Sequence, residues 1–195
     1  GFLLCIFIPA FFYSFGVNSW FMNPITTPIA LAGITANAEA FANGLAPTNI
    51  YTSNITFSVI FIGGMGVTLA LNVMMCRSKS KRLKRFGQVA LVPSLFNINE
   101  PLVYGAPIAL NPILMLPMWI NSLVIPTIVW FVLKAIPHAV MNVNQLPMPI
   151  CSFLATHGDF RVILLEVVLF AVSWVIWYPF FKAHEMKVLK EEEEA

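Results

Sequence analysis

One short stretch of this chain carries side chains that could bind a polar ligand in an otherwise apolar setting. Glu100 is preceded by Asn97 and Asn99 and followed by Pro101, and apolar residues lie on both sides of this group. A carboxylate accepts hydrogen bonds at about four lone-pair sites, and an amide both donates and accepts. Because sugars present rows of hydroxyl groups, the pair Asn99 and Glu100 is suited to binding a sugar.

Two other interpretations of Glu100 stay open from the residues alone. The acid could lie in an aqueous loop near the lipid head groups, where a carboxylate needs no partner. It could instead relay protons, as acids do in pumps, although the sequence places no chain of acids or histidines close to it. A carboxylate held at membrane depth is costly, so its presence there indicates a partner, water or a substrate.

The remaining polar residues give weaker signals. Asn18 could face the same cavity as Glu100, or it could only hydrogen-bond a neighbouring helix. Asp159 precedes a predicted helix and suits an N-cap, and His138 and His184 are expected at a solvated interface. The three cysteines are far apart and show no metal-ligand spacing. We therefore predict no catalytic residue, no metal site and no cofactor.

Composition indicates a membrane protein. Of the 195 residues 58% are hydrophobic and only 10% are charged, and the mean hydropathy is +0.80. A soluble domain carries roughly a quarter charged residues, because its surface faces water. The formal net charge of +2 gives no support to nucleic-acid binding. We expect an all-α, polytopic integral membrane fold.

Spanning helices and a hairpin must then position the polar group. A spanning helix needs about 20 mostly apolar residues. Four stretches qualify: residues 1–22, 50–76, 108–133 and 162–181. Residues 23–28 suggest a break, and residues 29–45 a short helix at the surface or in a protein interior. Residues 88–104 are too short to cross and run from apolar to polar to apolar, which predicts a re-entrant hairpin with Glu100 at its tip.

Clusters of charge predict the orientation of the chain. Six of the eleven basic residues lie within residues 77–85, and basic loops beside spans face the cytoplasm. Two predicted spans follow this loop, which returns the chain to the same side. The charged tail, residues 182–195, is therefore expected in the cytoplasm as a short helix.

Residues 92–105 carry a family signature. They read Val-Pro-Ser-Leu-Phe-Asn-Ile-Asn-Glu-Pro-Leu-Val-Tyr-Gly, and Asn-Pro follows at residues 111–112. This stretch resembles the lactose/cellobiose (chitobiose) family of enzyme IIC, the membrane subunit of bacterial sugar phosphotransferase systems. The agreement extends to residues 14–16, 22–24, 63–69, 153–156 and 159–161. Since members of the family are about twice as long, the resemblance assigns residues 1–195 to the C-terminal, substrate-binding half.

The resemblance implies roles for single residues. Asn99 and Glu100 become sugar ligands at a hairpin tip, and we include Asn97 and Asn18 among the substrate-binding candidates. Where the family usually has a His after Phe-Gly and an aliphatic residue, this chain has Asn18. An amide bonds sugar hydroxyls but cannot act as a cation or general base. Residues 144–147 also depart from the family's Pro-Trp-Thr type segment, and both departures bear on which sugar is bound.

The resemblance also implies a function and partners. The function is uptake of a disaccharide, of the β-linked cellobiose, chitobiose or lactose class, coupled to phosphorylation by cytosolic IIB and IIA proteins. The phosphoryl donor is a cysteine of IIB, so no chemistry is assigned to this chain. We expect a homodimer in contact with lipid in the bacterial plasma membrane, with a cytoplasmic C-terminus. A proton-coupled secondary transporter and a truncated, non-transporting paralogue that acts as a membrane interaction protein remain alternatives.

Overall fold

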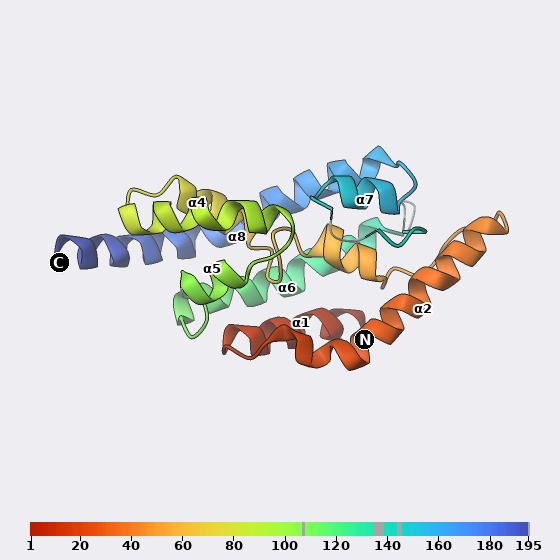
Figure 1. Ribbon diagram of the computed structural model, residues 1–195, viewed down its shortest axis with the longest axis horizontal. Coiled ribbons are helices and arrows are strands. Elements are labelled where there is room, and N and C mark those ends of the chain that lie inside the picture. The colour runs from red at the N-terminus through yellow and green to blue at the C-terminus, as the bar shows by residue number, and fades with distance from the viewer. Residues whose placement is uncertain (107, 135–138, 144–145, 195) are drawn as a thin grey trace.

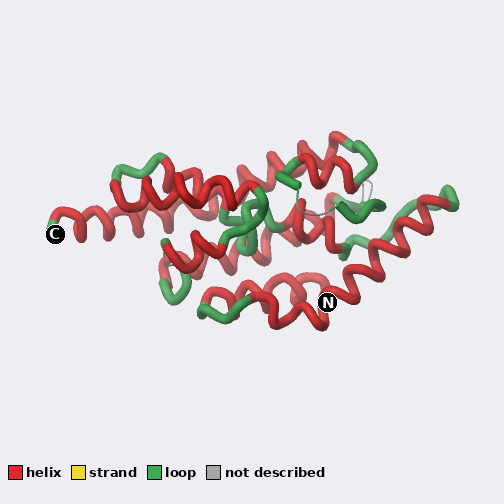
Figure 2. Tube along the Cα trace, in the orientation of Figure 1, coloured by secondary structure: helices red, strands yellow, loops and turns green. Residues whose placement is uncertain are grey.

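The structure is a computed structural model that describes residues 1–106, 108–134, 139–143 and 146–194, and no strand occurs among these residues. Its elements in chain order are α1 (Phe2–Ser14), the 3-10 helix η1 (Ser19–Met22), α2 (Asn23–Ala42), the π-helix η2 (Ile55–Ile60), α3 (Leu69–Cys76), α4 (Lys81–Leu95), α5 (Glu100–Gly105), α6 (Pro112–Val132), α7 (Ile150–Ala155) and α8 (Phe160–Glu193). The molecule is elongated, and α8 runs along much of its length (Figure 1). The helices are joined by irregular segments, several of which meet near the centre (Figure 2).

Two helices are long and apolar enough to cross a bilayer, α6 and α8. They correspond to the spans predicted at residues 108–133 and 162–181. Helix α6 begins at Pro112, so this proline starts the helix, where its fixed φ suits the first turn. Helix α8 continues through the charged tail to Glu193. The tail is therefore helical, as expected, but it is not a separate short helix.

The predicted span over residues 1–22 is wrong. Helix α1 ends at Ser14, and Gly16 adopts a φ of +88°, a left-handed conformation that ends helices. A short 3-10 helix follows, capped by Asn18. The break predicted at residues 23–28 is also wrong, because α2 begins there with a proline in its first turn. The turn at Gly16 is the break, since its left-handed backbone closes α1 through the bonds from the Gly16 and Val17 amides to Tyr13 and Phe12.

The predicted span over residues 50–76 is interrupted. Helices η2 and α3 cover its two ends, and residues 61–68 between them form no continuous helix. Gly63, Gly64, Gly66 and Val67 all have positive φ values. The three glycines allow this irregular connection, because glycine tolerates left-handed backbone at little cost.

The predicted hairpin is present, with different bounds. The sequence predicted a hairpin over residues 88–104. In the structure it consists of helix α4, a turn over residues 96–99 and the short helix α5. Helix α4 begins within the basic run, at Lys81, because Ser80 accepts a hydrogen bond from the Leu83 amide (3.1 Å) and caps it. Residues 77–85 are thus a short loop followed by the first turn of a helix.

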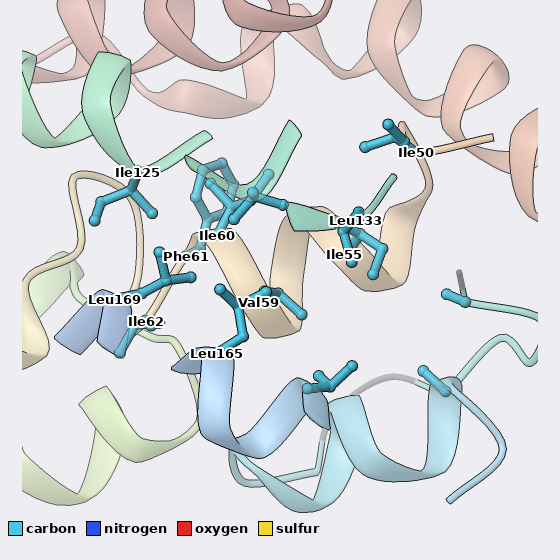
Figure 3. Packing of buried hydrophobic residues seen from close by; sticks show 14 of the residues in the cluster. Ile50, Ile55, Val59, Ile60, Phe61, Ile62, Ile125, Leu133, Leu165 and Leu169 are labelled. Atoms are coloured by element: carbon cyan, nitrogen blue, oxygen red, sulfur yellow. The ribbon is translucent and has the colours of Figure 1, made fainter. Parts of the chain in front are cut away.

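Two apolar cores hold these elements together. One lies around η2, the second half of α6 and the first half of α8. Figure 3 shows Val59 of η2 beside Leu165 of α8, and Ile55 of η2 beside Leu133 at the end of α6. The other core joins α3, α4, α5 and the second half of α8. Phe61, Ile62 and Val67 of the irregular segment belong to the first core, and Met65 packs against both cores.

The start of α4 is tied to the end of α8. Glu185 accepts hydrogen bonds from the Ser78 hydroxyl (2.6 Å) and the Lys79 amide (2.9 Å), and it pairs with Lys182 (2.7 Å). Burial acts to raise the pKa of Glu185, but the bonds from Lys182 and Ser78 outweigh it and hold the pKa below its usual range. The carboxylate is therefore charged at neutral pH, and this clamp fixes the basic loop against α8.

A second carboxylate makes a similar contact about two helical turns further along α8. Glu192 accepts from the Ser80 hydroxyl (2.8 Å) and the Arg82 amide (2.9 Å). The Arg82 amide and the Ser80 hydroxyl lower the pKa of Glu192. Glu192 thus occupies the Arg82 amide, one of the first backbone donors of α4, which an isolated helix would leave unsatisfied. Glu185 holds the loop just before α4.

Candidate functional site

The tip of the α4–α5 hairpin is built by a left-handed asparagine. Asn97 has a φ of +61°, its amide donates to the Ser94 carbonyl (3.1 Å), and the Ile98 amide donates to the Pro93 carbonyl (3.0 Å). This is the Schellman pattern of a helix C-terminus, where asparagine is the usual substitute for glycine. The chain therefore turns sharply after α4 and presents residues 98–100 at the tip.

The side chain of Asn97 holds the tip against the irregular segment 61–68. Its Oδ1 accepts from the Gly63 amide (2.9 Å), and its Nδ2 donates to the carbonyl of Phe57 in η2. Both ends of the amide are thus occupied by backbone groups. Asn97 is half-buried, and it connects the hairpin tip to the π-helix.

The side chain of Asn99 holds the same segment from another side. Its Nδ2 donates to the Met65 carbonyl (2.8 Å) and the Thr68 hydroxyl (3.1 Å), and its Oδ1 accepts from the Tyr13 hydroxyl at 3.4 Å. Asn99 is buried, with 3% of its surface exposed. Its amide donors are therefore already used within the protein, and its prediction as a direct sugar ligand stays a prediction.

Helix α8 completes the support of segment 61–68. The Val67 carbonyl accepts from the Ser173 hydroxyl (2.9 Å) and the Trp177 indole N–H (3.0 Å). The Thr68 hydroxyl donates to the Gly63 carbonyl (2.6 Å). Irregular backbone is tolerated at membrane depth only where protein or water satisfies its polar groups. Side chains from three separate parts of the chain do so here.

Glu100 differs from its two neighbours because its carboxylate is exposed. It makes no hydrogen bond or ion pair with the residues that the structure describes. Its charge lies close enough to Tyr13 and Tyr104 to act on both phenols, and these two rings pack edge to face at 5.7 Å. A carboxylate on a rigid tip with aromatic rings beside it can accept hydrogen bonds from ligand hydroxyls.

A cavity of about 200 Å³ lies among α1, η1, α2 and η2. Its lining mixes aromatic and hydroxyl side chains, including Trp20, Tyr51, Ser19, Thr26, Thr27 and Thr56. Phe57 and Met65 also line it, and their carbonyls are the ones that Asn97 and Asn99 hold. Apolar walls with a few polar groups are typical of ligand pockets. The cavity therefore adjoins the segment that supports the hairpin tip.

Asn18 lies beside this cavity, next to the lining residues Ser19 and Trp20. Its Oδ1 accepts from the Trp20 amide (3.0 Å), so its side chain caps η1. It makes no contact with Asn97, Asn99 or Glu100 within the interactions found in the described residues. The structure thus groups three predicted site residues at one tip and leaves Asn18 at a separate element.

Two residues that support the tip were not singled out from sequence, Tyr13 and Thr68. Both lie in stretches that the sequence presents as apolar spans, and no spacing signal marks them. Asp159 is an N-cap as predicted, accepting from the Arg161 amide at 2.8 Å, whereas the prediction for His138 falls outside the described residues. Within the described residues no group of three His, Cys, Asp or Glu side chains could hold a metal ion.

Comparison with known families gives a match to the family described as "Phosphotransferase system, EIIC", over residues 1–122. That match covers the hairpin tip and the cavity described above. Among curated proteins, the chain is 36% identical over 173 residues to the "Lichenan permease IIC component" of Bacillus subtilis (strain 168), covering 86% of this chain and 38% of that protein.

Two further relatives extend the comparison. The "PTS system lactose-specific EIICB component" of Staphylococcus aureus is 31% identical over 189 residues, covering 94% of this chain and 33% of that protein. The crystal structure of ChbC, the IIC component of the N,N'-diacetylchitobiose-specific phosphotransferase system, superposes with a TM-score of 0.93 at 27% identity. That superposition covers 98% of this chain and 46% of ChbC.

The chain spans less than half the length of each of these relatives. Over that length the helical architecture agrees with a membrane transporter of known structure. The expected all-α membrane fold is confirmed by this agreement, and with the match over residues 1–122 it identifies the chain as a member of the phosphotransferase system EIIC family.

Proposed function

We propose that this chain forms the substrate-binding part of a sugar permease that takes up a β-linked disaccharide for phosphorylation. Three relatives point to this class, since they are named for lichenan, lactose and N,N'-diacetylchitobiose. The observation that carries the proposal is the exposed carboxylate of Glu100 on a tip fixed by Asn97 and Asn99. That carboxylate is free to accept hydrogen bonds from sugar hydroxyls.

In this proposal the four candidate residues divide their roles. Glu100 contacts the sugar, while Asn97 and Asn99 keep the tip and segment 61–68 in place through the bonds described above. Asn18 contributes through the cavity beside η1. The chemistry belongs to the partners, because a phosphocysteine on cytosolic IIB, charged by IIA, donates the phosphoryl group. None of the three cysteines of this chain is assigned that role.

The proposal predicts how uptake is coupled. When the protein is reconstituted in liposomes, disaccharide uptake should require phosphorylated IIB inside and should continue when a protonophore collapses the proton gradient. Radiolabelled sugar trapped as its phosphate measures the coupling. Uptake that stops with the protonophore and ignores IIB would favour a proton-coupled transporter. Sugar binding that is absent altogether would favour a non-transporting paralogue.

We also propose that residues 77–85 and the tail after Phe181 both lie in the cytoplasm, and that the protein works as a homodimer in the bacterial plasma membrane. The hydrogen bonds that Glu185 and Glu192 accept from Ser78 and Ser80 support the same side of the membrane for these two segments. Helix α6 and residues 162–181 of α8 lie between the segments in the chain, and two crossings return the chain to the side on which it started. Basic residues favour the cytoplasm.

Labelling of single cysteines tests this topology. In a background without Cys5, Cys76 and Cys151, a cysteine at exposed Lys190 should react with a membrane-impermeant maleimide only after the membrane is opened. A cysteine at Phe160, exposed at the opposite end of α8, should react in intact cells and serves as the control. Reaction of position 190 in intact cells would contradict the proposed orientation.

A further inference from the structure

A second cavity, of about 120 Å³, lies between the start of α4, the α5–α6 connection and the end of α8. Its polar lining residues are Arg82, Asn111, His184, Lys187 and Glu191. A water molecule takes about 30 Å³ in the liquid, so this space suits a few waters or one tetrahedral oxyanion. It shares no lining residue with the cavity beside η1.

His184 was expected at a solvated interface, and the structure corrects this: only 6% of the residue is exposed. Its Nδ1 lies 3.4 Å from Asn111 Nδ2. The Asn111 amide is oriented by the Ile113 backbone N–H, which donates to Oδ1 (3.1 Å), so Nδ2 faces the imidazole as a donor. In a neutral ring Nδ1 must then accept, and the proton is on Nε2.

This assignment leaves a buried N–H donor on His184 Nε2, and that atom has no hydrogen-bond partner among the described residues. Buried donors are nearly always paired with protein, water or a ligand. Burial is the main cause that lowers the pKa of His184, with Lys187 and Arg82 adding to it and Glu191 opposing it. The ring is therefore neutral at pH 7 and lies within the field of both cations.

The charges around the cavity favour an anion. Arg82 and Lys187 contribute two positive charges against one negative charge from Glu191. The Arg82 guanidinium and the Glu191 carboxylate are 3.8 Å apart, and both are largely exposed, so this pair is weak. Arg82 therefore keeps donors available, and the guanidinium fork matches the geometry of phosphate oxygens.

We propose that this cavity binds a phosphate group through Arg82, Lys187 and the Nε2–H of His184. The group comes either from an anionic phospholipid or from soluble phosphate, because both present the same oxygens. The cavity lies just beyond the span 162–181, at the level where lipid head groups meet basic side chains. The site is separate from Glu100 and goes beyond the proposed sugar transport.

Histidine resonances test the site directly. The chain has three histidines, so ¹⁵N-histidine labelling gives few signals, and His184→Gln assigns one of them. In dodecyl maltoside, which carries no phosphate, inorganic phosphate should shift the His184 Nε2 signal saturably, compared with chloride at equal ionic strength. In nanodiscs, phosphatidylglycerol should shift it relative to phosphatidylcholine if the source is lipid. A response in either arm supports the site and names its source.

Two double variants distinguish phosphate binding at this cavity from general electrostatic attraction to a basic surface. Arg82→Gln with Lys187→Gln should weaken phosphate binding about tenfold or more for each cation removed. Arg85→Gln with Lys190→Gln removes the same charges from exposed positions outside the cavity and should leave binding unchanged. An unshifted His184 signal in both arms, or equal loss in both double variants, overturns the proposal.

Discussion

Glu100→Gln should weaken disaccharide binding by about five- to thirtyfold while leaving the fold intact. The exposed carboxylate makes no bond to the described protein, so its replacement disturbs no internal contact. Glutamine keeps one acceptor oxygen and turns the other into a donor. Sugar hydroxyls then lose charge-assisted bonds, worth about 1.5–3 kcal/mol against about 1 kcal/mol for neutral ones. Glu100→Ala should weaken binding more, because both acceptors are removed.

Calorimetric titration with lactose, cellobiose and N,N'-diacetylchitobiose measures the effect. Glu39→Gln is the matched control, since Glu39 is an exposed acid on α2, away from the hairpin tip. It should bind as the unaltered protein does. Wild-type affinity in the Glu100→Gln variant would remove Glu100 from the sugar site. Intact binding with lost dependence on the proton gradient would instead identify a proton relay.

The two long helices could be predicted from sequence, and two other spans could not. Length and hydropathy suffice for α6 and α8, which are uninterrupted apolar helices. Residues 1–22 and 50–76 have the same composition, but left-handed residues such as Gly16 and Gly64 interrupt them. A hydropathy profile does not depend on the backbone φ angle, so it does not reveal these interruptions. It also cannot show that distant side chains such as Asn99 satisfy the backbone that the interruption exposes.

The residues of the hairpin tip could be located from the sequence, but the internal contacts of its two amides could not. The signature around Glu100 located the hairpin tip, and the structure places Asn97 and Asn99 there with it. Sequence reasoning assigned both amides to the sugar, because an isolated amide beside an acid has free donors and acceptors. In the folded chain their donors bond to Phe57, Met65 and Thr68. These partners are more than 30 positions away along the chain, as the separations of 40, 34 and 31 show.

The misassignment of His184 has a related cause. A histidine in a charged tail is expected in water, and local composition supports that expectation. Helix α8, however, continues past the predicted span and packs against α3. Glu185 binds the loop before α4, and Glu192 binds the first turn of α4. The tail is thus paired through hydrogen bonds with residues 78–82. Burial of His184 follows from this pairing between segments separated by about 100 positions, since Glu185 and Ser78 are 107 apart.

Gly64→Ala should destabilise the protein by about 2–6 kcal/mol, from left-handed strain and overpacking together. Gly64 has a φ of +104°, and a Cβ there would lie 2.4 Å from Asn99 Cγ and 2.7 Å from Asn99 Oδ1. The amide cannot withdraw without giving up its bonds to Met65 and Thr68. The hairpin tip would therefore separate from segment 61–68, and sugar binding should be lost with the stability.

The variant Gly16→Ala measures the cost of left-handed backbone strain without a steric clash. Gly16 has a comparable φ of +88°, but a Cβ there meets nothing within 4 Å. Its cost is therefore the left-handed strain alone, about 1–3 kcal/mol, and sugar binding should persist. Thermal unfolding in detergent, with and without sugar, compares the two variants. If Gly64→Ala unfolds at the same temperature as Gly16→Ala and still binds sugar, Asn99 does not clamp the tip to segment 61–68. A larger loss for Gly64→Ala, together with lost binding, means that the carboxylate of Glu100 needs the buried Asn99 contact, in addition to the bonds of Asn97, for its position.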